Sequence, residues 1–149
     1  MPMDLREVLR RDVDELMKMN GSSVLLDTNI VISHFRGFNE NIQKHLEAEG
    51  KIFIPLTVFG ELMAGAYRSK DKEKSVDQIH IFLKIAALLI PDEITAMHYG
   101  EIYAEMAAKG TPIPQNDLWI AALAREHQIP LVTCDQHFER IQNMKILKW

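Results

Sequence analysis

The chain has a single cysteine, Cys134, among 149 residues. One thiol cannot form a disulfide framework or a zinc cluster of several thiolates, and we therefore expect a cytoplasmic protein. Long apolar runs are also missing, because no window offers the roughly 20 uncharged apolar residues that a membrane-spanning helix needs. The opening residues, MPMDLREVLRR, contain acids from residue 4 onward and no apolar block, so they do not resemble a signal peptide.

A basic excess is absent as well. The chain carries 17 lysines and arginines against 21 acids, a formal net charge of −4, whereas proteins that contact phosphates are usually basic. Any nucleic-acid role would need bound cations or a local basic patch. One cluster, Arg68, Lys70, Lys72 and Lys74, either contacts phosphates or is simply a solvated charged bend. The six histidines show no metal-ligand spacing such as HExxH, which favours surface or core roles over zinc binding.

The chain does contain short apolar runs separated by helical patterns. At 47% hydrophobic residues, its composition suits one globular domain with a real core. The runs predict short buried strands at Val24–Leu26, Ile52–Ile54, Ala87–Ile90, Leu131–Thr133 and 145–148. Such strands alternating with helices are typical of a parallel sheet covered on both faces. The predicted fold is therefore a three-layer α/β/α sandwich with a mainly parallel central sheet, plus an N-terminal helix.

Helix signals fill the segments between these strands. Thr57, Asp92 and Asn116 are predicted N-caps, and Gly110 is a predicted helix stop. Residues 1–21 are predicted to be a helical extension, starting near Asp4 and stopped by Gly21, on a domain that spans 22–149. The predicted helices within that domain cover 28–36, 39–49, 57–68, 73–86, 93–109, 116–127 and 136–141.

Four acids stand in unusual positions. Asp27 and Asp135 each follow a predicted strand, Glu61 lies among apolar residues and glycine in TVFGELMAG, and Asp117 opens the apolar helix NDLWIAALA. Each has an ordinary explanation. Asp27 and Asp135 would cap the helices that follow them, Asp117 would complement a helix dipole, and Glu61 would face water.

As a set, the four acids point to a cation site. Ligands of open α/β sheets bind beyond the carboxyl ends of the strands, where Asp27 and Asp135 are predicted to lie. No lysine or arginine is adjacent in sequence to any of the four acids. Carboxylate oxygens are the ligands that Mg²⁺ and Mn²⁺ prefer, and a bound cation would offset the cost of burying Asp27 between two apolar runs.

Four ordered segments carry a family resemblance: LLDTNIVI, FGELMAG, PIPQNDLWIAALA and LVTCDQHFERI. They resemble the signature segments of PIN-domain ribonucleases, and most closely those of VapC toxins from VapBC toxin–antitoxin pairs. The similarity runs from about residue 23 to the closing ILKW. The N-terminal helical extension lies outside it.

The resemblance implies that Asp27, Glu61, Asp117 and Asp135 meet in one acidic pocket that binds Mg²⁺, with Mn²⁺ as a substitute. It implies a metal-dependent endoribonuclease that cleaves RNA, with tRNA or rRNA as the expected substrate. Four polar residues beside the acids would orient ligands or a water: Thr28, Asn29, Asn116 and Thr133. No histidine is needed in this mechanism.

The resemblance also implies partners. A VapC-type toxin would form a homodimer and be inhibited by a VapB-type antitoxin that lies across the active groove. Two other enzyme classes are disfavoured. Haloacid-dehalogenase-type phosphatases need a second acid where this chain has Asn29, and response-regulator receivers need a lysine near the last strand, where this chain has Cys134 and Asp135. A PIN-like fold kept for binding alone remains the non-enzymatic alternative.

Overall fold

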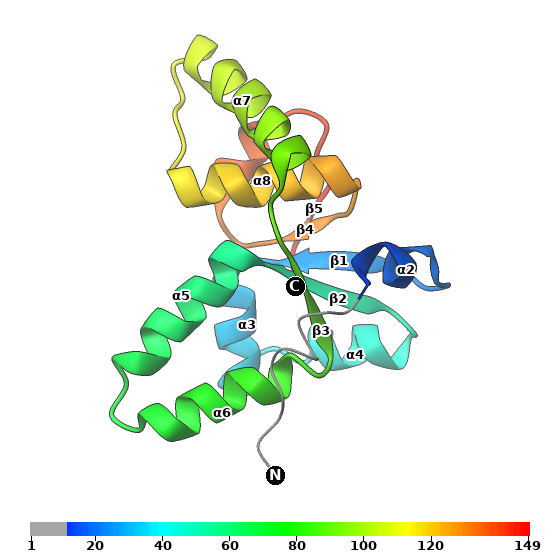
Figure 1. Cartoon of the computed structure of the whole chain (residues 1–149), viewed down its shortest axis with the longest axis vertical. Helices are drawn as coiled ribbons and strands as arrows, with labels where there is room; N and C mark the ends of the chain where they lie inside the picture. The colour runs from blue at the N-terminus through cyan, green and yellow to red at the C-terminus, as the bar shows by residue number, and fades with distance from the viewer. Residues whose placement is uncertain (1–11) are drawn as a thin grey trace.

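Five parallel strands form the centre of the molecule. The structure, a computed structural model, describes residues 12–149. Its strands lie in the order β3-β2-β1-β4-β5, and every neighbouring pair is parallel (Figure 1). Each strand falls within a residue or two of a predicted apolar run. Their bounds are β1 Ser23–Leu26, β2 Lys51–Pro55, β3 Ala86–Leu89, β4 Leu131–Val132 and β5 Ile146–Leu147.

Helices cover both faces of this sheet. Figure 1 shows α7 and α8 on one side and α3 to α6 on the other, which confirms the three-layer prediction. None of the helices within residues 12–149 combines the length and the apolar character needed to cross a bilayer. Their bounds are α2 Val13–Lys18, α3 Thr28–Phe35, α4 Asn41–Glu47, α5 Leu56–Tyr67, α6 Lys72–Phe82, α7 Glu93–Ala108 and α8 Gln115–His127, with a 3₁₀ helix at Gln136–Arg140.

Two predicted N-caps are wrong, and proline is the reason in both cases. The caps of α5 and α8 are Pro55 and Pro114, so Thr57 and Asn116 are each the second residue of a helix. A proline supplies an extended residue at the point where a helix begins and has no N–H to satisfy. Thr57 Oγ1 is buried without a hydrogen-bond partner in residues 12–149. The Asn116 amide instead donates a hydrogen bond to Glu61.

The prediction for α7 is confirmed at both ends. The Asp92 carboxylate accepts hydrogen bonds from the backbone N–H groups of Ile94 and Thr95, at 2.9 and 3.1 Å, and the Asp92 N–H donates to the Thr95 hydroxyl oxygen at 3.0 Å. This reciprocal arrangement is a capping box. Gly110, at φ +67°, follows the last turn in the left-handed conformation that glycine adopts without strain.

The described part of the N-terminal extension is short. Asp12, whose carboxylate accepts a hydrogen bond from the Glu15 N–H, begins α2, which ends at Lys18. The predicted start near Asp4 lies outside the described residues. The predicted stop, Gly21, comes three residues after the end of α2 and instead forms the turn into β1 at φ +103°. A Cβ at this position would meet the Glu49 carbonyl oxygen at 2.1 Å.

The order of the strands reverses at β1. From β1 the chain moves outward through β2 to β3, then returns to add β4 and β5 on the other side. The central strand is buried on both faces, with Leu25 and Leu26 fully inaccessible to solvent. In open α/β sheets the ligand site lies at this reversal, beyond the carboxyl ends of the strands. Here the reversal falls between the end of β1 and the end of β4.

Helix α8 packs against α7. Small residues lie at its centre, and the rings of Tyr99 on α7 and Trp119 on α8 are tilted by 37° with centroids 4.5 Å apart. At its C-terminal end, the half-buried Arg125 donates to both Glu105 oxygens on α7 at 3.0 and 3.1 Å and to the Gln142 carbonyl at 2.6 Å. The small residues, all buried, are Ala121, Ala122 and Ala124.

Candidate metal centre at the carboxyl edge of the sheet

Asp27 joins the two central strands across the point of reversal. Its Oδ1 accepts a hydrogen bond from the Thr28 N–H at 2.8 Å, so it caps α3 as the ordinary explanation requires. Its Oδ2 accepts from the Thr133 hydroxyl at 2.7 Å, and Thr133 directly follows β4. Capping therefore occupies one oxygen, while the other faces the end of the neighbouring strand.

Asp135 is held by the same threonine. The Asp135 N–H donates to Thr133 Oγ1 at 3.0 Å, which ties the two acids to one buried hydroxyl. Asp135 Oδ1 accepts from the His137 N–H at 2.9 Å and so caps the 3₁₀ helix. The capping interpretation is thus correct for both strand-end acids, and it does not exclude a second role.

Glu61 approaches from α5, on the other side of Asp27. It is exposed, as its ordinary explanation predicts, yet both of its oxygens are engaged. Oε2 accepts from the Thr28 hydroxyl at 2.6 Å and Oε1 from the Asn116 amide at 3.4 Å. Two residues that flank the strand-end site, one on α3 and one on α8, therefore orient this carboxylate.

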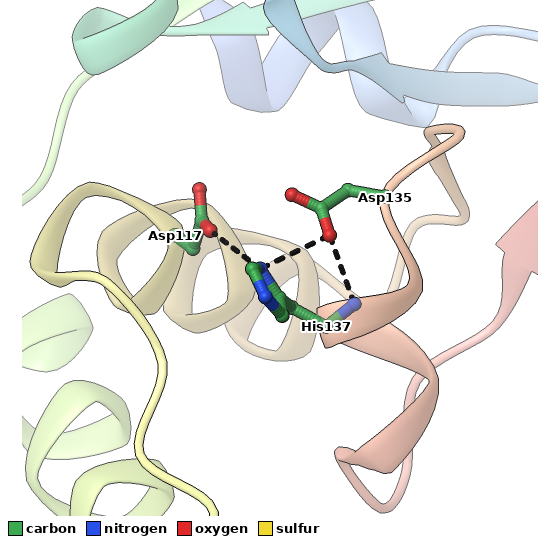
Figure 2. A group of neighbouring side chains, drawn as sticks. All are labelled: Asp117, Asp135 and His137. Atoms are coloured by element: carbon green, nitrogen blue, oxygen red, sulfur yellow. Dashed lines mark hydrogen bonds and ion pairs between the residues drawn. The ribbon is translucent and has the colours of Figure 1, made fainter.

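Asp117 lies in the first turn of α8 with its side chain 17% exposed. Its Oδ2 is 3.6 Å from Nδ1 of His137, and that nitrogen is 3.0 Å from Asp135 Oδ1. Figure 2 shows the imidazole between the two carboxylates. One ligand atom from each of these three residues lies within 4.8 Å of the other two.

Sequence reasoning missed His137, because no HExxH-type spacing marks it. The available signal was the position of His137, two residues after Asp135. An aspartate that caps a helix accepts a hydrogen bond from a backbone N–H two or three residues later. In this turn the side chain of His137, the residue that donates, lies close to the Asp135 carboxylate. His137 is therefore the one histidine of the described residues that lies among the predicted acids, while its role stays a prediction.

Mutual repulsion and burial shape the electrostatics of the site. Burial raises the pKa of Asp117 to about 6, and the carboxylates of Asp135 and Asp27 add to the shift, while His137 opposes it. The pKa of Asp27 is raised chiefly by burial, against the hydrogen bonds from Thr133 and Thr28, with Glu61 and Asp135 raising it further. No lysine or arginine is among the groups that shift either pKa.

The structure thus brings together the four predicted acids and three of the four predicted polar residues. Thr28 and Asn116 orient Glu61, and Thr133 connects Asp27 with Asp135. Asn29 differs: it is exposed in the first turn of α3, and no hydrogen bond within residues 12–149 joins its side chain to the acids. Asn29 is therefore outside the cluster as the structure has it.

These donors fit a divalent cation. Clustered carboxylates raise one another's pKa unless a positive charge lies among them. No lysine or arginine is among the groups that shift the pKa of Asp27 or Asp117. His137 Nδ1 is buried and makes no hydrogen bond within residues 12–149, although it lies 3.0 Å from Asp135 Oδ1. Carboxylate oxygens of Asp117 and Asp135 and this nitrogen therefore lie close enough together to hold a cation.

The predicted basic cluster lies elsewhere, at the turn between α5 and α6. All four of its residues are exposed, and Asp71 and Glu73 are interleaved with them. Asp71 caps α6 by accepting from the Lys74 N–H at 3.1 Å. This mixture of signs is what a solvated bend presents, so the cluster adds no distinct basic patch.

The chain resembles known proteins in both sequence and fold. A family model described as PIN domain matches residues 24–144. Ribonuclease VapC2 of Rickettsia felis is 33% identical over 129 residues, which cover 84% of this chain and 96% of that protein. The tRNA(fMet)-specific endonuclease VapC of Salmonella typhimurium is 32% identical over 127 residues, with the same coverage. The crystal structure of VapBC2 from Rickettsia felis bound to a DNA fragment from their promoter contains a chain with TM-score 0.79 and 30% identity, covering 85% of this chain and 98% of that one.

Proposed function

We propose, from the premise that this chain belongs to the PIN-domain family and is a VapC-type ribonuclease, that it hydrolyses RNA phosphodiester bonds with Mg²⁺, or with Mn²⁺ in its place. The substrate class is tRNA or rRNA. The similarity to the tRNA(fMet)-specific endonuclease VapC of Salmonella typhimurium supports the tRNA alternative.

One observation carries the metal dependence. Burial and neighbouring carboxylates raise the pKa of Asp27 and of Asp117, and no lysine or arginine is among the groups that shift either value. A fold that retains such repulsion at the edge of its sheet is less stable than one that pairs these acids. A cation bound among them would supply the missing charge, and it would also reduce the repulsion between an acidic pocket and an RNA phosphate.

Each residue then has a role that follows from its contacts. Asp27, Asp117 and Asp135 hold the ion directly or through water, with Thr133 fixing the relative positions of Asp27 and Asp135. Glu61, oriented by Thr28 and Asn116, is a ligand or the group that aligns the attacking water. Asn29 is a polar neighbour at the rim. When bound, the ion polarises a phosphodiester oxygen and lowers the pKa of a coordinated water.

The expected products are a 5′-phosphate and a 3′-hydroxyl. In-line attack by the water that Glu61 aligns would expel the 3′ oxygen of the preceding nucleotide. Such hydrolysis needs no nucleophilic side chain. The exposed Cys134 therefore has no part in it, although it lies between Thr133 and Asp135.

The proposal includes partners and boundaries. A VapB-type antitoxin inhibits the chain, in keeping with its similarity to toxin chains in VapBC structures. The chain acts in the cytoplasm as a homodimer, as the family resemblance implies. Residues 22–149 form the nuclease domain, in keeping with the match over 24–144, and residues 1–21 are an extension. Within that extension, Val13, Leu16 and Met17 pack against the core of the domain.

An RNA cleavage assay tests this function. Antitoxin-free protein is incubated with total tRNA and with rRNA, in Mg²⁺, Mn²⁺ or EDTA, beside Asp27→Asn. The control is Asp77→Asn, which removes an exposed carboxylate from α6. We expect discrete, metal-dependent cuts from the wild type and from the control, and none from Asp27→Asn. Identical RNA profiles for the wild type and Asp27→Asn, both folded, would mean that the fold serves binding alone.

A further inference from the structure

His137 is the one member of the metal centre that the function proposed above does not use. Its side chain is 45% exposed, but Nδ1 is buried and turned inward toward Asp117 and Asp135. The nitrogen lies 3.0 Å from one carboxylate and 3.6 Å from the other. This nitrogen therefore faces both carboxylates of the centre.

The two separations from Nδ1 approach that of neighbouring metal ligands. Octahedral coordination at about 2.1 Å places adjacent ligands about 3.0 Å apart. Nδ1 lies 3.0 Å from Asp135 Oδ1 and 3.6 Å from Asp117 Oδ2, and one ligand atom from each of the three residues lies within 4.8 Å of the other two. The three side chains would therefore need to draw closer together to share one ion.

Hydrogen bonding leaves Nδ1 available as a donor to a metal. Nδ1 makes no hydrogen bond within residues 12–149, although it lies 3.0 Å from Asp135 Oδ1, the oxygen that accepts from the His137 N–H at 2.9 Å. The same backbone bond fixes the position of His137 relative to Asp135. The carboxylate that caps the 3₁₀ helix therefore also presents the imidazole, and no separate element is needed to position it.

We infer that Asp117, Asp135 and His137 Nδ1 together bind a divalent ion, and that the imidazole gives the centre a preference for first-row transition metals, Mn²⁺ included, over Mg²⁺. The inference rests on the proposed function for the existence of a metal centre and adds the ligand that selects the ion. Carboxylate and water ligands suit Mg²⁺, whereas an imidazole nitrogen strengthens binding of transition metals and contributes little to Mg²⁺.

Electron spin-echo spectroscopy of bound Mn²⁺ tests the ligand directly. The full-length, metal-stripped protein is loaded with one equivalent of Mn²⁺, and the echo is examined for modulation by a coordinated ¹⁴N nucleus. We expect this modulation in the wild type, its loss in His137→Asn, and its retention in His80→Asn, which removes a histidine from α6. The wild-type spectrum alone is informative even if a variant folds poorly.

Titration with the two ions tests the selectivity. In His137→Asn we expect the Kd for Mn²⁺ to rise about tenfold or more, as for other disturbed metal sites, while the Kd for Mg²⁺ changes by less than about twofold. A wild-type spectrum without ¹⁴N modulation would overturn the inference, as would equal weakening of both ions. Those results leave the nuclease proposal intact. Wild-type protein that shows ¹⁴N modulation but leaves RNA uncut would support the inference and contradict the nuclease.

Discussion

The two ends of helix α8 treat a carboxylate in opposite ways. At the C-terminal end, Arg125 donates two hydrogen bonds to Glu105 and lowers the pKa of that carboxyl. At the N-terminal end, burial together with the carboxylates of Asp135 and Asp27 raises the pKa of Asp117 to about 6. The helix dipole favours an anion at the first end of a helix and a cation at the last, so the dipole agrees with both arrangements and does not explain the difference.

This difference in pKa distinguishes a structural ion pair from the proposed metal site. The Arg125–Glu105 pair joins α7, α8 and the loop before β5, and its two opposite charges lie against each other. The acids around Asp117 are connected to threonines, an asparagine and a histidine, which orient them without cancelling their charge. Three substitutions and the addition of Mg²⁺ test this contrast between the two ends of α8.

The largest effect is expected from Asp117→Asn. Removing one carboxylate from the metal centre should lower RNA cleavage at least about 100-fold. The same change relieves repulsion, so the metal-free protein should be equally stable or more stable by about 1 kcal/mol after solvent screening is considered. Gel-based cleavage and urea unfolding in EDTA measure the two effects. Lower activity accompanied by lower stability would instead make Asp117 a structural residue.

Arg125→Ala should cost stability at the opposite end of the helix. Glu105 would lose its bidentate partner and the Gln142 carbonyl its donor, which we expect to lower the free energy of unfolding by about 2–3 kcal/mol. Urea unfolding gives this value, with Arg68→Ala, an exposed arginine at the end of α5, as control. Cleavage by the folded protein should be retained. A loss below about 0.5 kcal/mol, typical of exposed positions, would remove the contrast.

Adding Mg²⁺ should raise the Tm of the protein through the acids at the N-terminal end of α8 and not through the ion pair at its C-terminal end. An ion at tenfold its Kd contributes about 1.4 kcal/mol, or a rise in Tm of about 3–5 °C in metal-stripped protein. The same rise should appear in Arg125→Ala and be absent from Asp117→Asn. Thermal unfolding at matched ionic strength with KCl measures it. An equal rise in all three proteins would indicate general screening by salt.

Glu105→Gln should give the smallest effect, and one that depends on pH. Because Arg125 lowers the folded-state pKa of Glu105 below its ordinary value of 4.5, the ion pair stabilises the fold above that pH and ceases to do so as the pH falls through the folded-state pKa. The wild type should exceed the variant by less than about 1 kcal/mol near neutrality, with no difference in strong acid. Urea unfolding across pH measures this. If the stability difference between the wild type and Glu105→Gln grew as the pH fell, the predicted pH dependence would have the wrong sign.

The sequence predicted the elements well because their signals are local. Short apolar runs bounded by glycine, proline or polar residues gave the five strands, and Asp92 with Gly110 gave both ends of α7. The errors at Thr57 and Asn116 arose from a competing local rule, since a proline two residues earlier already begins each helix. Local rules could not decide the order of the strands, which depends on packing between distant segments.

The candidate site was predictable for a different reason. The acids could be found individually, but only the family resemblance brought Asp27 and Asp117 into one pocket, because contact between residues 90 positions apart leaves no local trace. Thr133, which links the strand-end acids, was identified in the same way. His137 was missed because its placement depends on the backbone bond to Asp135, which is a property of the folded turn.

The reversal of strand order at β1 also determines when the active arrangement can arise as the chain folds. Asp27 is bound to Thr133, 106 residues later, through the pairing of β1 with β4. Strands β1 to β3 pair with one another and can associate first, at the lower entropic cost of shorter loops. A chain interrupted before residue 131, by incomplete synthesis or by proteolysis, therefore retains Asp27 and Glu61 but cannot assemble the metal centre. Such fragments would be harmless to RNA, and the toxic activity would appear only in the last stage of folding.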